Sequence, residues 1–151
     1  MNIDQTLLII AVPAAMIHVA EEYKYGWVSW SNAFISGITI KQFIVINAMF
    51  VILCIIAAIS SRGFIAFSSS IFSLFLINSL VHIAPAIKQK QYSPGLLSAV
   101  FLFIPIGVVG YTSLLAHDLL SLKSFMFSIL LGLLWMSIPF VYQILRAACG
   151  R

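Results

Sequence analysis

The chain has 151 residues, of which 62% are hydrophobic and only 8% are charged, and its mean hydropathy is +1.12. A soluble domain of this size needs far more charge on its surface, so the composition excludes that class and indicates an integral membrane protein. The length allows one bundle without a separate soluble domain. The net charge of +4 does not indicate a nucleic-acid partner, because the basic residues are scattered singly, as membrane anchors are.

Five segments are long and apolar enough to cross a bilayer, which takes about 20 helical residues. They are predicted over residues 5–23, 39–60, 63–87, 93–116 and 124–146. The first is followed by YKYGWVSWSNAFISG, which is too short and polar to span and whose aromatic residues indicate a segment at the membrane interface. The sequence therefore predicts an all-α integral membrane protein: one domain over residues 1–151, a bundle of about five transmembrane helices with a short interfacial segment after the first.

An odd number of spans places the two termini on opposite sides of the membrane, and the basic residues indicate which side is which. One side receives only Arg62 and Lys123, and the other receives Lys24, Lys41, Lys88, Lys90, Arg146 and Arg151. Basic residues concentrate on the cytoplasmic side of membrane proteins. We therefore expect the N-terminus outside and the C-terminus in the cytoplasm.

Several polar residues fall at one depth once the helix directions are set. They are His18, Glu21, Glu22, Asn47, Asn78 and His82. At a rise of about 1.5 Å per residue they lie roughly 5–15 Å below the expected cytoplasmic surface. His18 and Glu22 are one turn apart, as are Asn78 and His82, so each pair shares a helix face. We expect these faces to meet between helices.

Two interpretations of this polar layer stay open. In the first, the charged groups reach the headgroups, and Asn and His serve as interhelical hydrogen bonds worth about 0.6–2 kcal/mol. In the second they form a site, because a charge at helix mid-depth costs about 2.5–3.5 kcal/mol and needs a reason to be there. Two imidazoles and a carboxylate are the ligands of catalytic zinc and of non-haem iron. On this view His18, Glu22 and His82 are the metal ligands, Glu21 is a general base, and Asn47 and Asn78 orient the ligands.

The same residues resemble the HXXEE family of small integral membrane proteins. The resemblance is carried by His18-Val-Ala-Glu21-Glu22, by Asn78-Ser-Leu-Val-His82 (NxxxH) and by Tyr92-Ser-Pro-Gly95 (YxPG), in that order. It implies a functional set but no settled reaction: His18, Glu21, Glu22, Asn78, His82, Tyr92, Pro94 and Gly95. The YxPG residues predict a turn that opens the fourth helix, with Pro94 near its first turn and Gly95 allowing close approach. Tyr92 is expected at the membrane surface, where it gates the layer, touches a substrate or is an ordinary interfacial tyrosine.

We expect an intramembrane enzyme with His18, Glu21, Glu22 and His82 as catalytic residues. A divalent metal, zinc or iron, is the expected cofactor, and direct acid–base chemistry by the same residues is the alternative. The expected substrate is lipid-like or isoprenoid-like and undergoes hydrolysis, isomerisation or cyclisation. The rival functions are a proton- or metal-coupled carrier and a structural subunit whose polar cluster locks helix packing. A carrier requires polar residues that continue to the other face, and the outer halves of the helices read as lacking them.

The small residues of the later helices predict packing. We expect Gly107, Gly110 and Gly132 to allow close helix approach. Serine hydroxyls within apolar helices commonly bond backbone carbonyls, which is the role expected of Ser68, Ser69, Ser70 and Ser73.

Overall fold

A computed structural model of the chain describes residues 3–34 and 37–149. Within these ranges the chain is helical and contains no strand, which confirms the predicted fold class. The elements in chain order are α1 (Ile3–Lys24), α2 (Trp27–Ser31), α3 (Ile40–Ser60), the 3₁₀ turn η1 (Ser61–Phe64), α4 (Ile65–Gln89), α5 (Leu96–Ser98), the π-helical turn η2 (Ala99–Phe103), α6 (Ile104–Ala116) and α7 (Leu122–Cys149).

Five stretches of helix are long and apolar enough to cross a membrane, so the protein is a multi-pass membrane protein. Their bounds are Gln5–Lys24, Ile40–Ser60, Ile65–Gln89, Leu96–Ala116 and Leu122–Tyr142, within a few residues of the predicted spans. The fourth is composite, because α5, η2 and α6 follow one another without a break. The segment expected at the interface contains the short helix α2. The residue before this helix, Gly26, has a left-handed backbone conformation.

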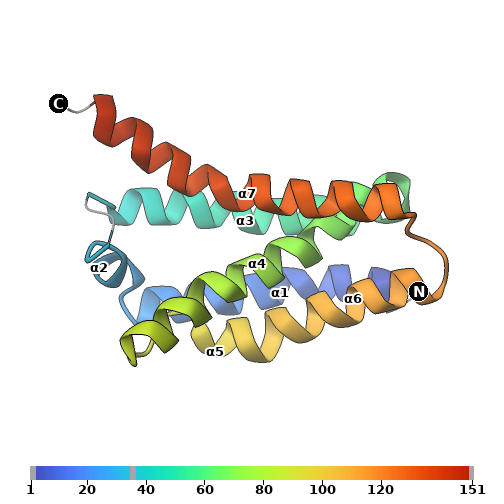
Figure 1. Cartoon of the computed structure of the whole chain (residues 1–151), viewed down its shortest axis with the longest axis horizontal. Helices are drawn as coiled ribbons and strands as arrows, with labels where there is room; N and C mark the ends of the chain where they lie inside the picture. Colours follow the sequence, from blue (N-terminus) through green and yellow to red (C-terminus); the bar gives the residue numbers. More distant parts are fainter. Residues whose placement is uncertain (1–2, 35–36, 150–151) are drawn as a thin grey trace.

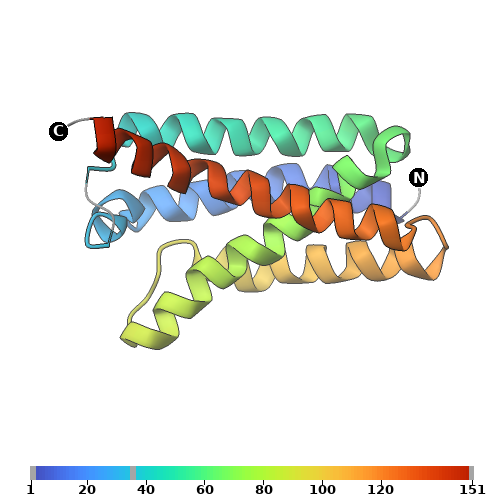
Figure 2. The same cartoon turned by 45° about the horizontal axis from the view of Figure 1, so that its top comes forward.

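The helices run side by side along one long axis (Figures 1 and 2). In both views α2, the α4–α5 connection and the last turns of α7 lie at one end of the bundle. The N-terminal turns of α1, η1 and the α6–α7 connection lie at the other end. The end of α1 and the end of α4 are therefore at the same end, as the predicted polar layer requires.

Small residues let α4 lie against its neighbours. A Cβ atom added to Gly132 of α7 would lie 2.5 Å from the Cβ atom of Ser73, and one added to Gly110 of α6 would lie 2.6 Å from the ring of Phe72. At Gly107 the nearest atom would be Leu76 Cγ at 2.7 Å. The expected close packing at these three glycines is confirmed, and it places α4 at the centre of the bundle.

An aromatic core lies between α4 and the fourth span. Phe75 and Phe103 are fully buried and stack with their ring centroids 3.8 Å apart. Phe103 also lies against the imidazole of His18, with a centroid separation of 4.5 Å. The core is therefore continuous with the polar layer. The outer surface is apolar as well, for instance at Ile59, which is 78% exposed, as expected of helices that face lipid.

Candidate functional site

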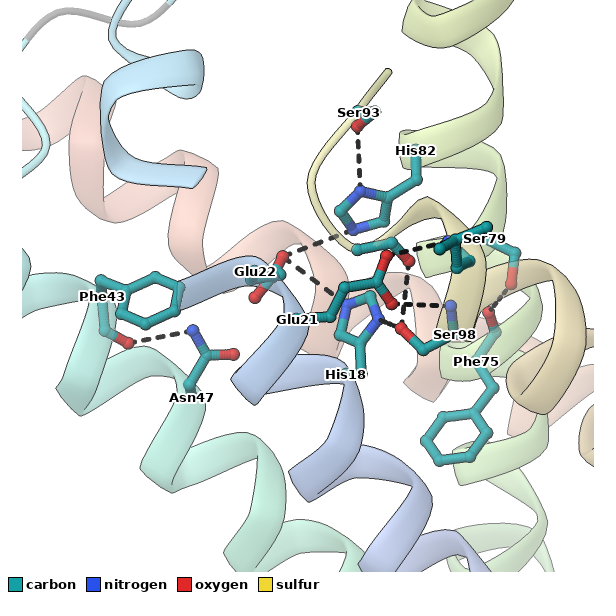
Figure 3. Close-up of polar contacts among 12 residues, drawn as sticks. His18, Glu21, Glu22, Phe43, Asn47, Phe75, Ser79, His82, Ser93 and Ser98 are labelled. Carbon is teal, nitrogen blue, oxygen red and sulfur yellow. Dashed lines mark hydrogen bonds and ion pairs between the residues drawn. The ribbon is translucent and has the colours of Figure 1, made fainter. Parts of the chain in front are cut away.

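His18 and Glu22 of α1 and His82 of α4 meet at one point inside the bundle (Figure 3). All three are buried, with exposed fractions of 1%, 5% and 1%. The Oε1 atom of Glu22 lies 3.6 Å from His18 Nε2 and 3.4 Å from His82 Nε2. Ligand atoms bound at about 2.0–2.2 Å to a tetrahedral zinc ion lie roughly 3.3–3.6 Å from one another, so both carboxylate–imidazole spacings suit a metal ion. All three atoms lie within 4.8 Å of one another, which makes His18, Glu22 and His82 three candidate ligands.

The hydrogen bonds of the outer ring nitrogens leave both Nε2 atoms facing the carboxylate. Ser98 Oγ lies 2.8 Å from His18 Nδ1 and 3.2 Å from the carbonyl oxygen of Gly95. When its hydrogen is donated to Gly95, it accepts from Nδ1, and His18 Nε2 carries the lone pair in that tautomer. His18 Nε2 is buried without a hydrogen-bond partner. His82 Nδ1 lies 3.1 Å from Ser93 Oγ. Metal-bound histidines are held by this kind of contact at the other ring nitrogen.

Gly95 of the YxPG turn closes the site. Its φ of 98° is in the left-handed region, which favours glycine. A Cβ atom at this position would lie 2.7 Å from His82 Cε1 and 2.8 Å from His18 Cε1. The absence of a side chain therefore lets the backbone lie directly against both imidazole rings. Ser93 and Pro94 are buried in the same turn.

Glu21 is placed beside the three ligands but faces a different partner (Figure 3). Its Oε1 atom accepts hydrogen bonds from the Leu97 amide at 2.9 Å and from the Tyr92 hydroxyl, and its Oε2 atom accepts one from the Ser98 amide at 2.8 Å. The carboxylate thus satisfies amides that a helix start leaves unpaired. Glu21 therefore anchors the start of α5, and the general-base role expected from the sequence stays a prediction.

Tyr92 lies at the end of the bundle, 39% exposed, with its ring edge against Tyr25 at a centroid separation of 5.2 Å. Partial burial raises the pKa of the Tyr92 hydroxyl, and the hydrogen bond to Glu21 and the charge of Glu21 raise it further. The hydroxyl therefore stays a hydrogen-bond donor to Glu21 at neutral pH. The contact indicates a role that the sequence did not suggest, a clasp between Tyr92 and Glu21 that holds the YxPG turn against α1.

A cavity of about 250 Å³ adjoins the cluster of His18, Glu22 and His82, and both Glu22 and His82 line it. Its remaining walls come from α2, α3, α4 and α7 and are mostly aromatic and aliphatic. The tryptophans of the chain, Trp27, Trp30 and Trp135, all line it. Small-molecule sites are commonly cavities of this kind, apolar with a few polar groups, although this one is below the usual range of about 300–1,000 Å³.

Asn47 and Asn78 line this cavity and do not bond the histidines. The Nδ2 atom of Asn47 donates to the Phe43 carbonyl at 3.1 Å, and the Oδ1 atom of Asn78 is buried without a partner. The orienting contacts that the sequence suggested for these amides are made instead by Ser93 and Ser98. Sequence reasoning missed both serines, although one lies inside the YxPG motif and the other three residues after it.

Two further features were not expected. The π-helical turn η2 directly follows the site and carries Phe103, which packs on His18; π-helical turns are frequent at functional sites. In the other half of the bundle, Ser73 bonds the hydroxyl of Tyr111, which bonds Ser128 Oγ at 2.7 Å. Ser69 and Ser70 bond backbone carbonyls as predicted. The prediction was wrong for Ser68, whose buried Oγ has no partner, and for Ser73, which Tyr111 of α6 reaches across the helix interface.

The chain matches the family described as "Protein of unknown function with HXXEE motif" over residues 9–110, more than half of its length. The matched range contains the three ligand residues, the YxPG turn and the two serines. Searches of curated proteins and of solved structures found no match to the chain. The chain therefore belongs to the HXXEE family.

Proposed function

We propose that the protein is a metal-dependent enzyme of the membrane that acts on a lipid-like substrate. His18, Glu22 and His82 would hold a divalent ion, zinc or iron(II), and the substrate would occupy the adjoining cavity. One observation carries the proposal: three buried ligand side chains from two helices converge on a point at the wall of an apolar cavity.

The electrostatics of the cluster support an ion. His18 Nε2 and the Glu22 carboxylate are both acceptors when the imidazole is neutral, and they face one another in a buried place. A buried carboxylate without a compensating charge is strongly unfavourable. A divalent ion compensates all three groups together. A proton shared between Glu22 and one histidine would compensate only that contact and would leave the other histidine nitrogen unpaired.

The donor set also supports catalysis over a purely structural ion. Structural zinc sites are closed by four protein ligands, whereas catalytic sites have three and keep one position for water or substrate. His18, Glu22 and His82 supply three, and two of them line the cavity. Such an ion polarises a carbonyl group or acidifies water, which suits hydrolysis or a proton-transfer isomerisation.

The neighbouring residues have supporting tasks in this proposal. Ser93 and Ser98 hold the outer nitrogens of the histidines, so that the Nε2 lone pairs point at the ion. Glu21 and Tyr92 hold the YxPG turn against the imidazole rings. The apolar walls keep bulk water from the reacting group, which strengthens electrostatic interactions there.

Metal analysis of the purified protein tests the proposal. Wild-type protein prepared without chelator should hold about one ion per chain. His18→Ala, Glu22→Ala and His82→Ala should each remove it, while His117→Ala should not. His117 is the matched control, because it is the third histidine of the chain and lies exposed beyond the end of α6. Full occupancy in folded His82→Ala would contradict the shared site. So would wild-type protein that takes up neither zinc nor iron(II) on reconstitution.

A further inference from the structure

We infer that the cavity beside the three ligands binds a single-chain lipid with an uncharged head group that donates a hydrogen bond, such as a long-chain alcohol or primary amide. The inference rests on the proposed function, because the ligand is taken to be the substrate of the same site. It adds the charge and hydrogen-bonding character of the head group, which the metal ligands alone do not determine.

The charge of the cavity wall excludes anionic lipids. Among the described residues that line it, the only ionisable side chains are Glu22 and His82, and none is Lys or Arg. A phosphate head carries nearly two negative charges and a pyrophosphate head carries more. A divalent ion and the Glu22 carboxylate together would neutralise only one of them, and no Lys or Arg of the wall would neutralise the rest. Burying an unpaired charge is far more costly than burying a hydrogen-bonded neutral group. An uncharged head avoids this cost.

Two amides in the wall accept hydrogen bonds from a ligand. Asn78 lies one turn before His82 on the same face of α4, and its Oδ1 atom is buried and has no partner. Asn47 lies across the cavity on α3, and because its Nδ2 atom bonds Phe43, its Oδ1 atom is left as an acceptor (Figure 3). A buried acceptor without a partner is unfavourable, because it has lost its hydrogen bonds to water and gained none in return. A donor on the ligand, placed beside His82, removes that cost after a rotation of the Asn78 amide.

The apolar walls of the cavity favour a hydrocarbon chain as the remaining part of the ligand. Trp27 and Trp30 of α2, Leu53 of α3 and Trp135 of α7 enclose the cavity from different sides. Its volume of about 250 Å³ is small for a ligand site, so one apolar chain fits it better than the two chains of a phospholipid. The bilayer around the helices holds such single-chain lipids in solution.

The tryptophans provide the measurement, because bromine atoms quench tryptophan fluorescence on contact. The full chain is placed in nanodiscs of phosphatidylcholine and titrated with bromoundecanol, bromoundecyl phosphate and bromoundecane. Bromoundecanol should quench at a concentration at least about tenfold lower than bromoundecyl phosphate, because the phosphate carries a charge that no group of the cavity wall neutralises. Equal or tighter quenching by the phosphate would overturn the inference. This comparison uses wild-type protein only.

Two variants assign the binding to the cavity and to the amide. Leu53→Phe fills the cavity and should weaken quenching by bromoundecanol about tenfold, whereas Ile59→Phe, on the lipid-facing side of the same helix, should not. Asn78→Leu should abolish the preference for bromoundecanol over bromoundecane. Quenching that Leu53→Phe leaves unchanged would show binding to the outer surface and would contradict the inference.

The outcomes separate this inference from the proposed function. Protein that binds bromoundecanol in the cavity but takes up no metal contradicts the metal-dependent enzyme and leaves the ligand class standing. Protein with one ion per chain that prefers the phosphate contradicts the ligand class alone.

Discussion

Gly95 is the residue at which the backbone and the candidate metal ligands come closest. Its conformation is left-handed, and an added Cβ atom would lie within 2.8 Å of both imidazole rings. Gly95→Ala should therefore displace the YxPG turn or the rings and lower metal occupancy well below one ion per chain. Strain and overpacking together should lower the free energy of unfolding by roughly 2–4 kcal/mol. Metal analysis and thermal melting in detergent measure the two effects.

Gly26→Ala is the matched control for Gly95→Ala. Gly26 is also left-handed, with φ of 73°, but a Cβ atom there would meet nothing within 4 Å. It should show the modest cost of strain and keep the metal. If Gly26→Ala and Gly95→Ala lost metal to the same degree, the contact of Gly95 with the histidines would not be the cause.

The sequence predicts correctly that some of the site residues come together and misses the contacts of others. His18, Glu22 and His82 were paired correctly, because i,i+4 spacing on α1 and helix depth on α4 restrict them to one face and one layer. Depth does not determine which way Asn47 and Asn78 turn around their helices, and both lie in the cavity wall. Ser93 and Ser98 were missed because a hydroxyl acquires its role only from a partner distant in the sequence, as with His18 and Ser98.

The elements show why helix ends are harder to predict than spans. A bilayer requires about 20 apolar residues, so the spans follow from hydropathy alone. The fourth was expected to begin at residue 93, but α5 begins at Leu96. Its first amides are bonded by Glu21, which belongs to another helix and is far away in the sequence. No sequence pattern within residues 89–96 indicates that contact, so the start of α5 was not predicted correctly.

The connection between α1 and α5 depends on the charge of Glu21. Glu21→Gln replaces one carboxylate oxygen by an NH₂ group, which cannot accept from the amide that it faces. We expect the variant to lower the melting temperature, at a cost of about 1–3 kcal/mol. Glu22→Gln should keep or raise it while removing the metal, because it removes a buried charge. Melting in detergent of metal-free protein compares the two variants. If Glu21→Gln left the melting temperature unchanged and Glu22→Gln lowered it strongly, the structural role given to Glu21 and the buried-charge role given to Glu22 would both be contradicted.

The same connection predicts a dependence on pH through Tyr92. The pKa of Tyr92 in the folded protein is raised above its ordinary value of 10.0, so the hydrogen bond to Glu21 contributes its full stability below that pH and loses it as the pH rises through the raised value. The difference in melting temperature between wild type and Tyr92→Phe should be constant from about pH 7 to about pH 9 and shrink above pH 10. If the difference in melting temperature between the two proteins grew as the pH rises above 10, the stabilising Tyr92–Glu21 contact would be contradicted.

For the whole molecule, the bundle has two chemically different ends. The end with α2, the α4–α5 connection and the last turns of α7 contains the cavity and the cluster of His18, Glu22 and His82. The other half contains the hydroxyl network of Ser73, Tyr111 and Ser128. The sequence did not predict a polar network in that half, and the structure contains one. These hydroxyls bond one another across α4, α6 and α7, which supports helix packing more than a path for ions.

The orientation of the bundle decides which compartment the site faces. Lys24, Lys41, Lys88 and Lys90 lie near the end that holds the site, whereas Lys123 lies in the first turn of α7 at the other end. The excess of basic residues predicts that the site end is cytoplasmic. A cysteine in place of Lys88 should therefore be protected from a membrane-impermeant thiol reagent in intact cells and react after permeabilisation. One in place of Lys123 should react at once. Cys149 is first replaced by Ser, and Cys54 is kept because it is buried. Labelling of Lys88→Cys in intact cells would invert the topology, so that a metal ion and a lipid head would have to reach the site from outside.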